Sequence, residues 1–532
     1  MELQMYSNEL NAQFRTLQSQ LRDRWQALEV LDNSDYDILV IPSLSLDQRE
    51  LQKIEGFLHY EERLLFSLIR LQNPRTRVIY VTSLPLAQIA IDYYLQLLPG
   101  IPFSHARDRL VLFSAYDASA TSLTKKILER PRLIERIRAS LRTEKTYMIC
   151  YNSTPLEREL SVQLNVPLLA LDPDLLYWGT KSGSRQIFQE SGVPFPDGSE
   201  LVKNADDLAV EAAQLWERQP TLQRMVVKLN EGFSGEGNAL LDLRPIGDKA
   251  PGSASHNERV KAIASSFANL KFEAKGETWD NFSTRIKELG AIVEAFIEGE
   301  IKRSPSVQAR IIPTGEVEIL STHDQILGGP SGQIYLGCEF PADESYRLML
   351  QQLGLKVGQN LALKGALERF SVDFIAVQKP DIAGVPQWDI QAIEINLRKG
   401  GTTHPLMTLK FLTNGRYDLS TGLFYSQNAC PKYYIATDNL QKDRYKGLLA
   451  NDLMDIIAIH RLHFDTSTET GTVFHLMGCL SEFGKLGLTS IGNSPQQAQD
   501  IYNRVVKVLD EETKPRRKEM NERDIDFAKS KI

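Results

Sequence analysis

Short apolar runs alternate with amphipathic stretches over the first third of the chain. We predict an amphipathic helix over residues 1–31, because leucine and phenylalanine recur there at spacings of three and four. The further predicted strands are 36–42, 76–82, 109–113 and 146–151, and the predicted helices between them are 47–72, 86–98 and 121–141. Such alternation is typical of a parallel sheet with helices on both faces. Residues 1–175 are therefore predicted to form one α/β domain.

The pattern changes after residue 175. From 176 to 415 the chain shows paired strands, glycine-rich turns and fewer long helices, which indicates an α+β domain. Within it, residues 245–280 run from a Gly/Ser/Pro-rich loop into a polar helix and are predicted to be a surface insertion. Residues 416–532 are mixed again and end in a highly charged tail, so we predict a third, smaller α+β domain there.

Composition narrows the class of protein. The 532 residues are 42% hydrophobic and carry a net charge of −7, which argues against a sequence-independent nucleic-acid binder. The four cysteines lack the spacing of a zinc site or a disulfide framework. The N-terminus has no apolar signal core, and no run of about 18 apolar residues occurs. We expect a cytoplasmic protein that binds neither nucleic acid nor membrane.

Residues 225–238 form the first segment with candidate chemistry. An apolar run delivers Lys228, and the glycine-dense turn that follows contains Gly232, Ser234, Gly235 and Gly237. Glycines let backbone N–H groups approach phosphate oxygens, and the lysine adds a charge for the same phosphates. No GK[ST] follows, and the turn does not open a helix, so it is neither a Walker loop nor a dinucleotide fingerprint. Taken alone, a flexible hairpin turn fits equally well.

The second segment, residues 291–300, is an apolar strand interrupted by glutamates. Its backbone amides would read an adenine edge, and Glu300 would accept the ribose hydroxyls. A strand at a sheet edge with one solvated face would have the same pattern.

The third segment is the most specific. Asp373 lies on one predicted strand, and Glu394 and Asn396 lie two apart on the next, so the latter two share a face. Three converging oxygen donors suit Mg²⁺, which keeps positions open for water and phosphate. Arg398 lies on the same face, where its guanidinium would bind a phosphate oxygen. The alternative is a hairpin with a polar exposed face.

In this order the three segments resemble the signature of the ATP-grasp superfamily, over about residues 176–407. The sequences KSGSR (181–185), LNEGFSGEGN (229–238) and EINLRKGGTTHP (394–405) are most similar to its branch of pheganomycin-type peptide ligases. That branch has a pre-ATP-grasp domain before the ATP-grasp fold and a dedicated domain after it. The loop at 327–333 does not align with general ATP-grasp ligases, so the site of the acceptor amine stays unassigned.

The resemblance implies a role for each matching residue. The implied ATP-binding residues are Lys181, Lys228, Gly232, Ser234, Gly235, Gly237, Glu294, Ala295, Ile297 and Glu300. The implied magnesium ligands are Asp373, Glu394 and Asn396, and the implied catalytic residues are Lys228, Arg398 and Arg310. For Arg310, an exposed strand arginine is the alternative.

The resemblance also implies a reaction. Mg·ATP would phosphorylate a small-molecule or peptide carboxylate, and an amine would capture the acyl phosphate to give an amide, ADP and phosphate. Two alternatives stay open: an ATP-grasp kinase that stops after phosphorylation, and a regulatory protein that binds ATP without turnover. A homodimer is expected on general frequency.

Overall fold

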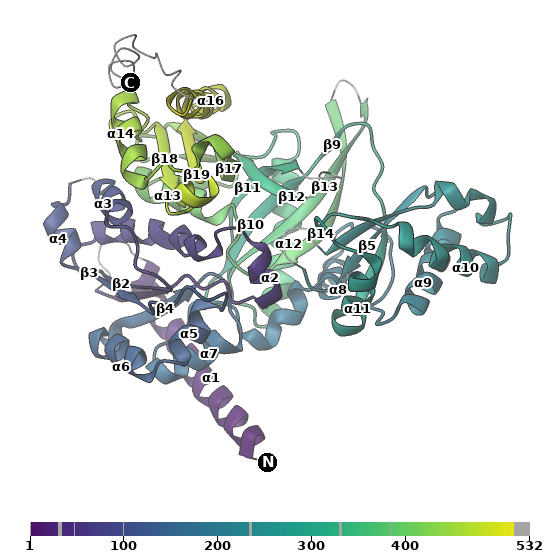
Figure 1. The fold of residues 1–532 in the computed structure, drawn as a ribbon, viewed down its shortest axis with the longest axis horizontal. Helices are drawn as coiled ribbons and strands as arrows, with labels where there is room; N and C mark the ends of the chain where they lie inside the picture. Colours follow the sequence, from purple (N-terminus) through teal and green to yellow (C-terminus); the bar gives the residue numbers. More distant parts are fainter. Residues whose placement is uncertain are drawn as a thin grey trace, which may run out of the picture.

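The computed structural model describes residues 2–29, 35–46, 48–98, 100–232, 237–328, 332, 334–382 and 385–514. Within these residues the strands form three sheets, one in the N-terminal part, one in a lobe built around residues 205–295, and a large one between them (Figure 1).

The N-terminal sheet is parallel, with strand order β3-β2-β1-β4. Its strands are β1 (Asp37–Ile41), β2 (Arg77–Thr82), β3 (Leu110–Ser114) and β4 (Thr146–Cys150). The surrounding helices are α1 (Glu2–Glu29), α2 (Gln48–Lys53), η1 (Phe57–Gln72), α3 (Gln88–Gln96), α4 (Phe103–Arg107), α5 (Leu123–Leu128), α6 (Pro131–Ser140), η2 (Thr143–Lys145) and α7 (Pro155–Leu164). Alternate β1 residues enter two different cores, Ile38 with η1 and α3, and Leu39 with α5, α6 and α7. The predicted α/β fold is confirmed.

Two predicted helices of this part were wrong in detail. The helix expected over 47–72 is interrupted at Gly56, whose φ of 69° is left-handed, and continues as the 3-10 helix η1. The helix expected over 121–141 is two helices, because Pro131 lacks an N–H and begins a new one.

The second sheet is antiparallel, with order β7-β6-β5-β8. Its strands are β5 (Arg224–Leu229), β6 (Asn238–Asp242), β7 (Lys271–Phe272) and β8 (Ala291–Ala295), and its helices are α9 (Ala205–Arg218), α10 (His256–Ser266) and α11 (Trp279–Leu289), with the short turns η4 (Arg244–Lys249) and η5 (Phe267–Asn269). Ile263 of α10 and the following Phe267 are buried in the core under this sheet. The expected surface insertion is therefore partly core, because one side of its helix is apolar.

The central sheet contains eleven strands within the described residues. They are β9 (Lys302–Arg303), β10 (Pro305–Ile311), β11 (Val317–Gly328), β12 (Ile334–Phe340), β13 (Glu368–Ile382), β14 (Val385–Asn396), β15 (Arg416–Asp418), β16 (Leu423–Tyr425), β17 (Pro431–Gln441), β18 (Gly471–His475) and β19 (Lys485–Gly492). The accompanying helices are η3 (Pro173–Gly179), α8 (Lys181–Ser191), α12 (Arg347–Leu363), α13 (Thr403–Thr413), η6 (Asp443–Tyr445), α14 (Ala450–His460), α15 (Cys479–Phe483) and α16 (Pro495–Glu512).

Pairing of β12 with β17 joins the C-terminal strands to this sheet, with Gly337 opposite Thr437. The boundaries of the three predicted domains stay predictions, and residues 515–532 of the charged tail lie outside the described residues. No described helix has the length and apolar character to cross a bilayer.

Candidate active site

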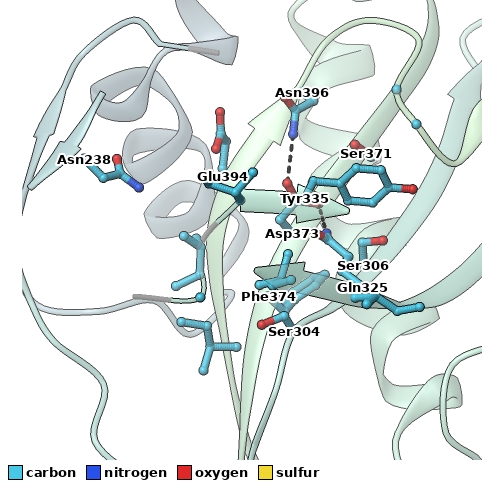
Figure 2. A pocket seen from close by; sticks show the side chains of 18 of the residues that line it. Asn238, Ser304, Ser306, Gln325, Tyr335, Ser371, Asp373, Phe374, Glu394 and Asn396 are labelled. Atoms are coloured by element: carbon cyan, nitrogen blue, oxygen red, sulfur yellow. Dashed lines mark hydrogen bonds between the residues drawn. The ribbon is translucent and has the colours of Figure 1, made fainter. Parts of the chain in front are cut away.

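One cavity of about 1020 Å³ is lined by residues of the second sheet, of the central sheet and of the N-terminal part. Nine residues singled out from the sequence line it: Lys181, Lys228, Glu294, Ala295, Ile297, Asp373, Glu394, Asn396 and Arg398. They come from segments that are far apart in the sequence, so the fold brings together what the motifs only suggested. Figure 2 shows part of this wall.

The hairpin β13–β14 carries the three oxygen donors. Asp373 lies opposite Glu394 in register, and Asn396 follows on the same face. Asn396 Nδ2 donates to Asp373 Oδ2 at 3.0 Å, and Gln325 Nε2 donates to Asp373 Oδ1 at 2.8 Å (Figure 2). Burial, followed by the charge of Glu394, raises the pKa of Asp373 to about 7. Two carboxylates that repel each other across a hairpin favour a cation between them.

This donor set fits the magnesium ion that the resemblance implies. Carboxylate and amide oxygens are the ligands Mg²⁺ prefers, and one cavity wall presents all three. Lys181 already forms an ion pair with Glu394. Arg398 Nη2 donates to Asn396 Oδ1 at 3.0 Å. The side-chain cations of Lys181 and Arg398 therefore both lie beside this set of oxygen donors.

Hydrogen bonds from the first turn of α8 to two neighbouring segments fix the position of Lys181. Its N–H donates to Asn230 O at 3.0 Å, and the N–H of Ser182 donates to Asn230 Oδ1 at 2.9 Å. One turn on, Ser184 Oγ accepts from the N–H of Ile395 at 3.1 Å. These bonds tie the helix to the loop after β5 and to β14, so Lys181 has a fixed position relative to Glu394.

The second lysine lies in the lobe of β5–β8. Lys228 Nζ is 2.5 Å from Glu294 Oε2, and Arg185 Nη1 is 2.8 Å from Glu294 Oε1. Burial alone would raise the pKa of Glu294, but these two cations hold it below its usual value. Glu294 therefore fixes Lys228 on the cavity wall.

Between these charged groups the wall is apolar. Its side chains include Pro196, Val226, Phe296, Phe374 and Ile393. Beside them, Lys302 Nζ donates to Ile297 O at 2.9 Å. A flat heterocycle such as adenine fits an apolar surface of this kind with backbone groups at its edge.

Several predicted residues lie elsewhere. Among the described residues, Glu300 is exposed and Gly232, Gly237 and Arg310 do not line the cavity. Arg310 forms an ion pair with Glu318 on β11, and Gln308 on the same strand lies between it and the wall residue Ser306. The predicted phosphate contacts of Ser234 and Gly235 fall outside the described residues.

The sequence alone did not identify some lining residues. Gln325 bonds Asp373, Lys302 closes the apolar side, and Arg63, Tyr151 and Lys485 come from the N-terminal part and from β19. Of these, Gln325 carried a local signal, because it ends the polar run His323-Asp324-Gln325, which indicates a candidate substrate-side segment with a structural hydrogen-bonding pair as the alternative. The others meet the cavity through long-range packing that no local spacing encodes.

The chain is similar to two known families and to proteins of known type. A family described as IQCH-like, ATP-grasp matches residues 175–250 and 248–420, and one described as PGM1 C-terminal domain matches residues 452–505. L-propargylglycine–L-glutamate ligase of Streptantibioticus cattleyicolor is 29% identical, over 88% of this chain and 93% of the relative.

IQ motif-containing protein H of Danio rerio is 23% identical, over 89% of this chain and 48% of that protein. Among solved structures, biotin carboxylase from Campylobacter jejuni is 13% identical with a TM-score of 0.50, over 87% of this chain and 88% of that one. The family match covers the segments that carry Lys181, Lys228 and the β13–β14 hairpin, and the solved structure shares the fold. Residues 175–420 of the chain therefore match the ATP-grasp family.

Proposed function

We propose that the protein is an ATP-dependent carboxylate–amine ligase of the peptide-forming type. One observation carries the proposal: Lys181, Lys228, Arg398 and the oxygen donors of the β13–β14 hairpin line a single cavity. Joining two anions, a carboxylate and the γ-phosphate, requires concentrated positive charge in a shielded site. The name of the Streptantibioticus relative, a ligase of two amino acids, supports the same class of reaction.

The first step would form an acyl phosphate. A carboxylate oxygen of the donor attacks the γ-phosphorus, the bond from that phosphorus to the β–γ bridging oxygen breaks, and ADP leaves. Lys181 and Lys228 would bind the phosphates, and Arg398 would bind the transferred phosphoryl group. Asp373, Glu394 and Asn396 would hold Mg²⁺, which when bound supplies charge neutralisation on the phosphates.

The second step would form the amide. The amine nitrogen attacks the acyl carbon, the bond from carbon to the phosphate oxygen breaks, and phosphate leaves while the nitrogen loses a proton. An acyl phosphate hydrolyses readily, so burial of the wall residues is useful in excluding water. Lys181 and Lys228 are both at least nine-tenths buried, which agrees with a shielded site.

The remaining predictions follow the same proposal. Ala295 and Ile297 would offer backbone groups to adenine beside the apolar wall. The roles given to Glu300 and Arg310 keep only sequence support. The cytoplasmic location and the homodimer also stay predictions.

The test is turnover with Mg·ATP and a pool of L-amino acids and short peptides, followed by mass spectrometry of the same samples. ADP, phosphate and a new mass equal to acid plus amine minus water are expected. A phosphorylated small molecule formed without an amine would instead establish the kinase. ATP binding without ADP in any pool would favour the regulatory protein.

A further inference from the structure

A second pair of cations lines the cavity, on elements that carry none of the proposed ATP residues. Lys485 begins β19, and Arg63 lies on η1. Lys485 is 6% exposed, and its Nζ donates to Tyr60 Oη at 2.8 Å. Within the described residues it forms no ion pair with a carboxylate. A buried ammonium is normally paired, so an uncompensated one on a cavity wall indicates an anionic ligand.

Arg63 is fixed beside it. Its Nη1 donates to Tyr151 Oη at 2.8 Å, and its guanidinium carbon lies 4.3 Å from the centre of the Tyr60 ring. On the far side Arg63 forms an ion pair with Asp438. Tyr60, Arg63, Tyr151 and Lys485 all line the cavity, so two cations and two hydroxyl groups form one polar corner.

A buried cluster of Asp438, His475 and His404 contacts Arg63 and fixes its orientation. His475 Nε2 is 2.7 Å from Asp438 Oδ1, and His404 Nε2 is 3.3 Å from the same oxygen. By ligand type these three side chains would suit a metal ion. The Arg63 guanidinium on the same carboxylate opposes a divalent cation there. Burial, together with the charges of His475 and Arg63, lowers the pKa of His404, so the group orients Arg63 through one carboxylate and neutral imidazole.

The position of the corner distinguishes it from the phosphate site. The groups proposed for ATP and for the acyl phosphate come from α8, β5, β8 with the segment after it, and the β13–β14 hairpin with the segment after it. The corner comes from η1, from Tyr151 directly after β4, and from β19. The activated carboxylate must bond to the γ-phosphate and so must lie beside Arg398 and Glu394. A carboxylate bound at Lys485 is a different one, and it survives in the product.

We propose that Lys485 and Arg63 bind the free carboxylate of the amine substrate, which is therefore an α-amino acid or the carboxylate end of a short peptide. This inference rests on the proposed ligase function and names the substrate class of the same cavity. Lys53 and Glu55 also line the wall, where Lys53 pairs with Glu50 and Glu55 accepts from Gln441.

The test uses the full-length protein with Mg·ATP and the same donor pool. The acceptors are either the proteinogenic L-amino acids or the corresponding L-amino-acid amides, which lack the negative charge. The wild type should form at least about tenfold more product from the acids, since a hydrogen bond to a charged group is worth this much. Equal product from the amides would overturn the inference.

Lys485→Met keeps the length of the side chain and removes its charge. It should raise the KM of the acceptor acid about tenfold and abolish the preference over the amide, while the KM of ATP stays within about twofold. Lys485→Arg should recover part of the preference. Lys442→Met is the matched control, because Lys442 pairs with Asp510 away from the cavity. An unchanged acid preference in Lys485→Met would contradict the proposal.

A binding measurement separates this inference from the ligase proposal. If no variant forms a condensation product with either pool, the ligase proposal fails. Saturation-transfer NMR of the amino-acid pool with Mg·ADP then tests the corner without turnover. A signal that is present in the wild type and lost in Lys485→Met supports the anion site, and an equal or absent signal in both proteins refutes it.

Discussion

Lys228 and Glu294 form a buried ion pair across strands β5 and β8, with 2.5 Å between Nζ and Oε2. The other carboxylate oxygen of Glu294 accepts from Arg185 on α8 at 2.8 Å. One carboxylate thus connects strand β5 with helix α8 and holds a lysine on the cavity wall. Its single negative charge faces two cations.

Lys228→Met should lower both stability and ATP affinity. Glu294 keeps its ion pair with Arg185, so the loss of Lys228 should cost about 2 kcal/mol, the value of one hydrogen bond to a charged group. If Lys228 also binds phosphate, the KM of ATP should rise at least about tenfold. Denaturant unfolding and steady-state kinetics measure the two effects separately.

The double variant Lys228→Met/Glu294→Gln separates the structural effect from the functional one. The reference is Glu294→Gln alone, in which Lys228 has no carboxylate partner at this position, so adding Lys228→Met should cost no further stability. The KM of ATP should still rise when Lys228→Met is added. An equal KM of ATP in Glu294→Gln and in the double variant would show that Lys228 acts only through the fold.

Glu394→Gln should reduce kcat by roughly 100-fold, because it removes one of two carboxylates proposed to hold the metal. It also removes the ion-pair partner of the buried Lys181, so stability should fall as well. The variant should also need more Mg²⁺ for half-maximal rate. ADP release over a magnesium titration measures kcat and this magnesium requirement. Glu298→Gln is the control, since Glu298 is exposed and pairs with Arg224 off the cavity. Equal kcat in the two variants would count against the metal assignment.

Local periodicity explains why part of the site was predictable. Glu394 and Asn396 share a face because side chains alternate along a strand, and Asp373 joins them because a short loop forces β13 and β14 to pair. The same reasoning predicted the parallel N-terminal sheet from four apolar runs. In both cases the pattern that predicts the element is local, although β1 pairs with the distant strand β4.

Contacts between distant segments were not predictable in this way. Lys485 and Tyr60 are 425 residues apart, and Gln325 and Asp373 are joined only because β10 lies between their strands. For Glu300 and Arg310 the sequence prediction failed in the other direction. Their spacing matched a motif, yet neither residue lines the cavity. The direction of the backbone after Ala295 and the length of β10 determine where Glu300 and Arg310 lie. The spacing of motif residues along the sequence encodes neither.

Gly183→Ala should destabilise the protein, although alanine normally favours a helix over glycine by about 1 kcal/mol. A Cβ at Gly183 would lie 2.0 Å from the carbonyl oxygen of Tyr177, so the first turn of α8 must shift. Because Lys181 lies in that turn, the KM of ATP should rise as well.

Gly247→Ala is the matched control for this effect. Its Cβ would meet no atom within 4 Å, so stability should change by less than about 0.5 kcal/mol. Thermal unfolding of both variants measures the contrast. Similar stability of the two would mean that the close approach of α8 to Tyr177 is not required.

Glu61 should make stability depend on pH. Its buried carboxylate accepts from Ser83 N and Ser83 Oγ, both at 2.6 Å, and burial raises its pKa from 4.5 to about 7. The folded state therefore binds a proton more tightly than the unfolded chain. This contribution to the free energy of unfolding is fully present below pH 4.5 and is lost as the pH rises to about 7.

Glu61→Gln imitates the protonated acid and does not titrate, so it isolates this contribution. The wild-type free energy of unfolding minus that of the variant should fall by about 3 kcal/mol across this pH range and stay constant above it. Urea denaturation of both proteins at half-unit pH intervals measures the difference. A difference that rises with pH would mean that the folded protein stabilises the ionised carboxylate, through Ser83 and the nearby Lys126, more than burial destabilises it.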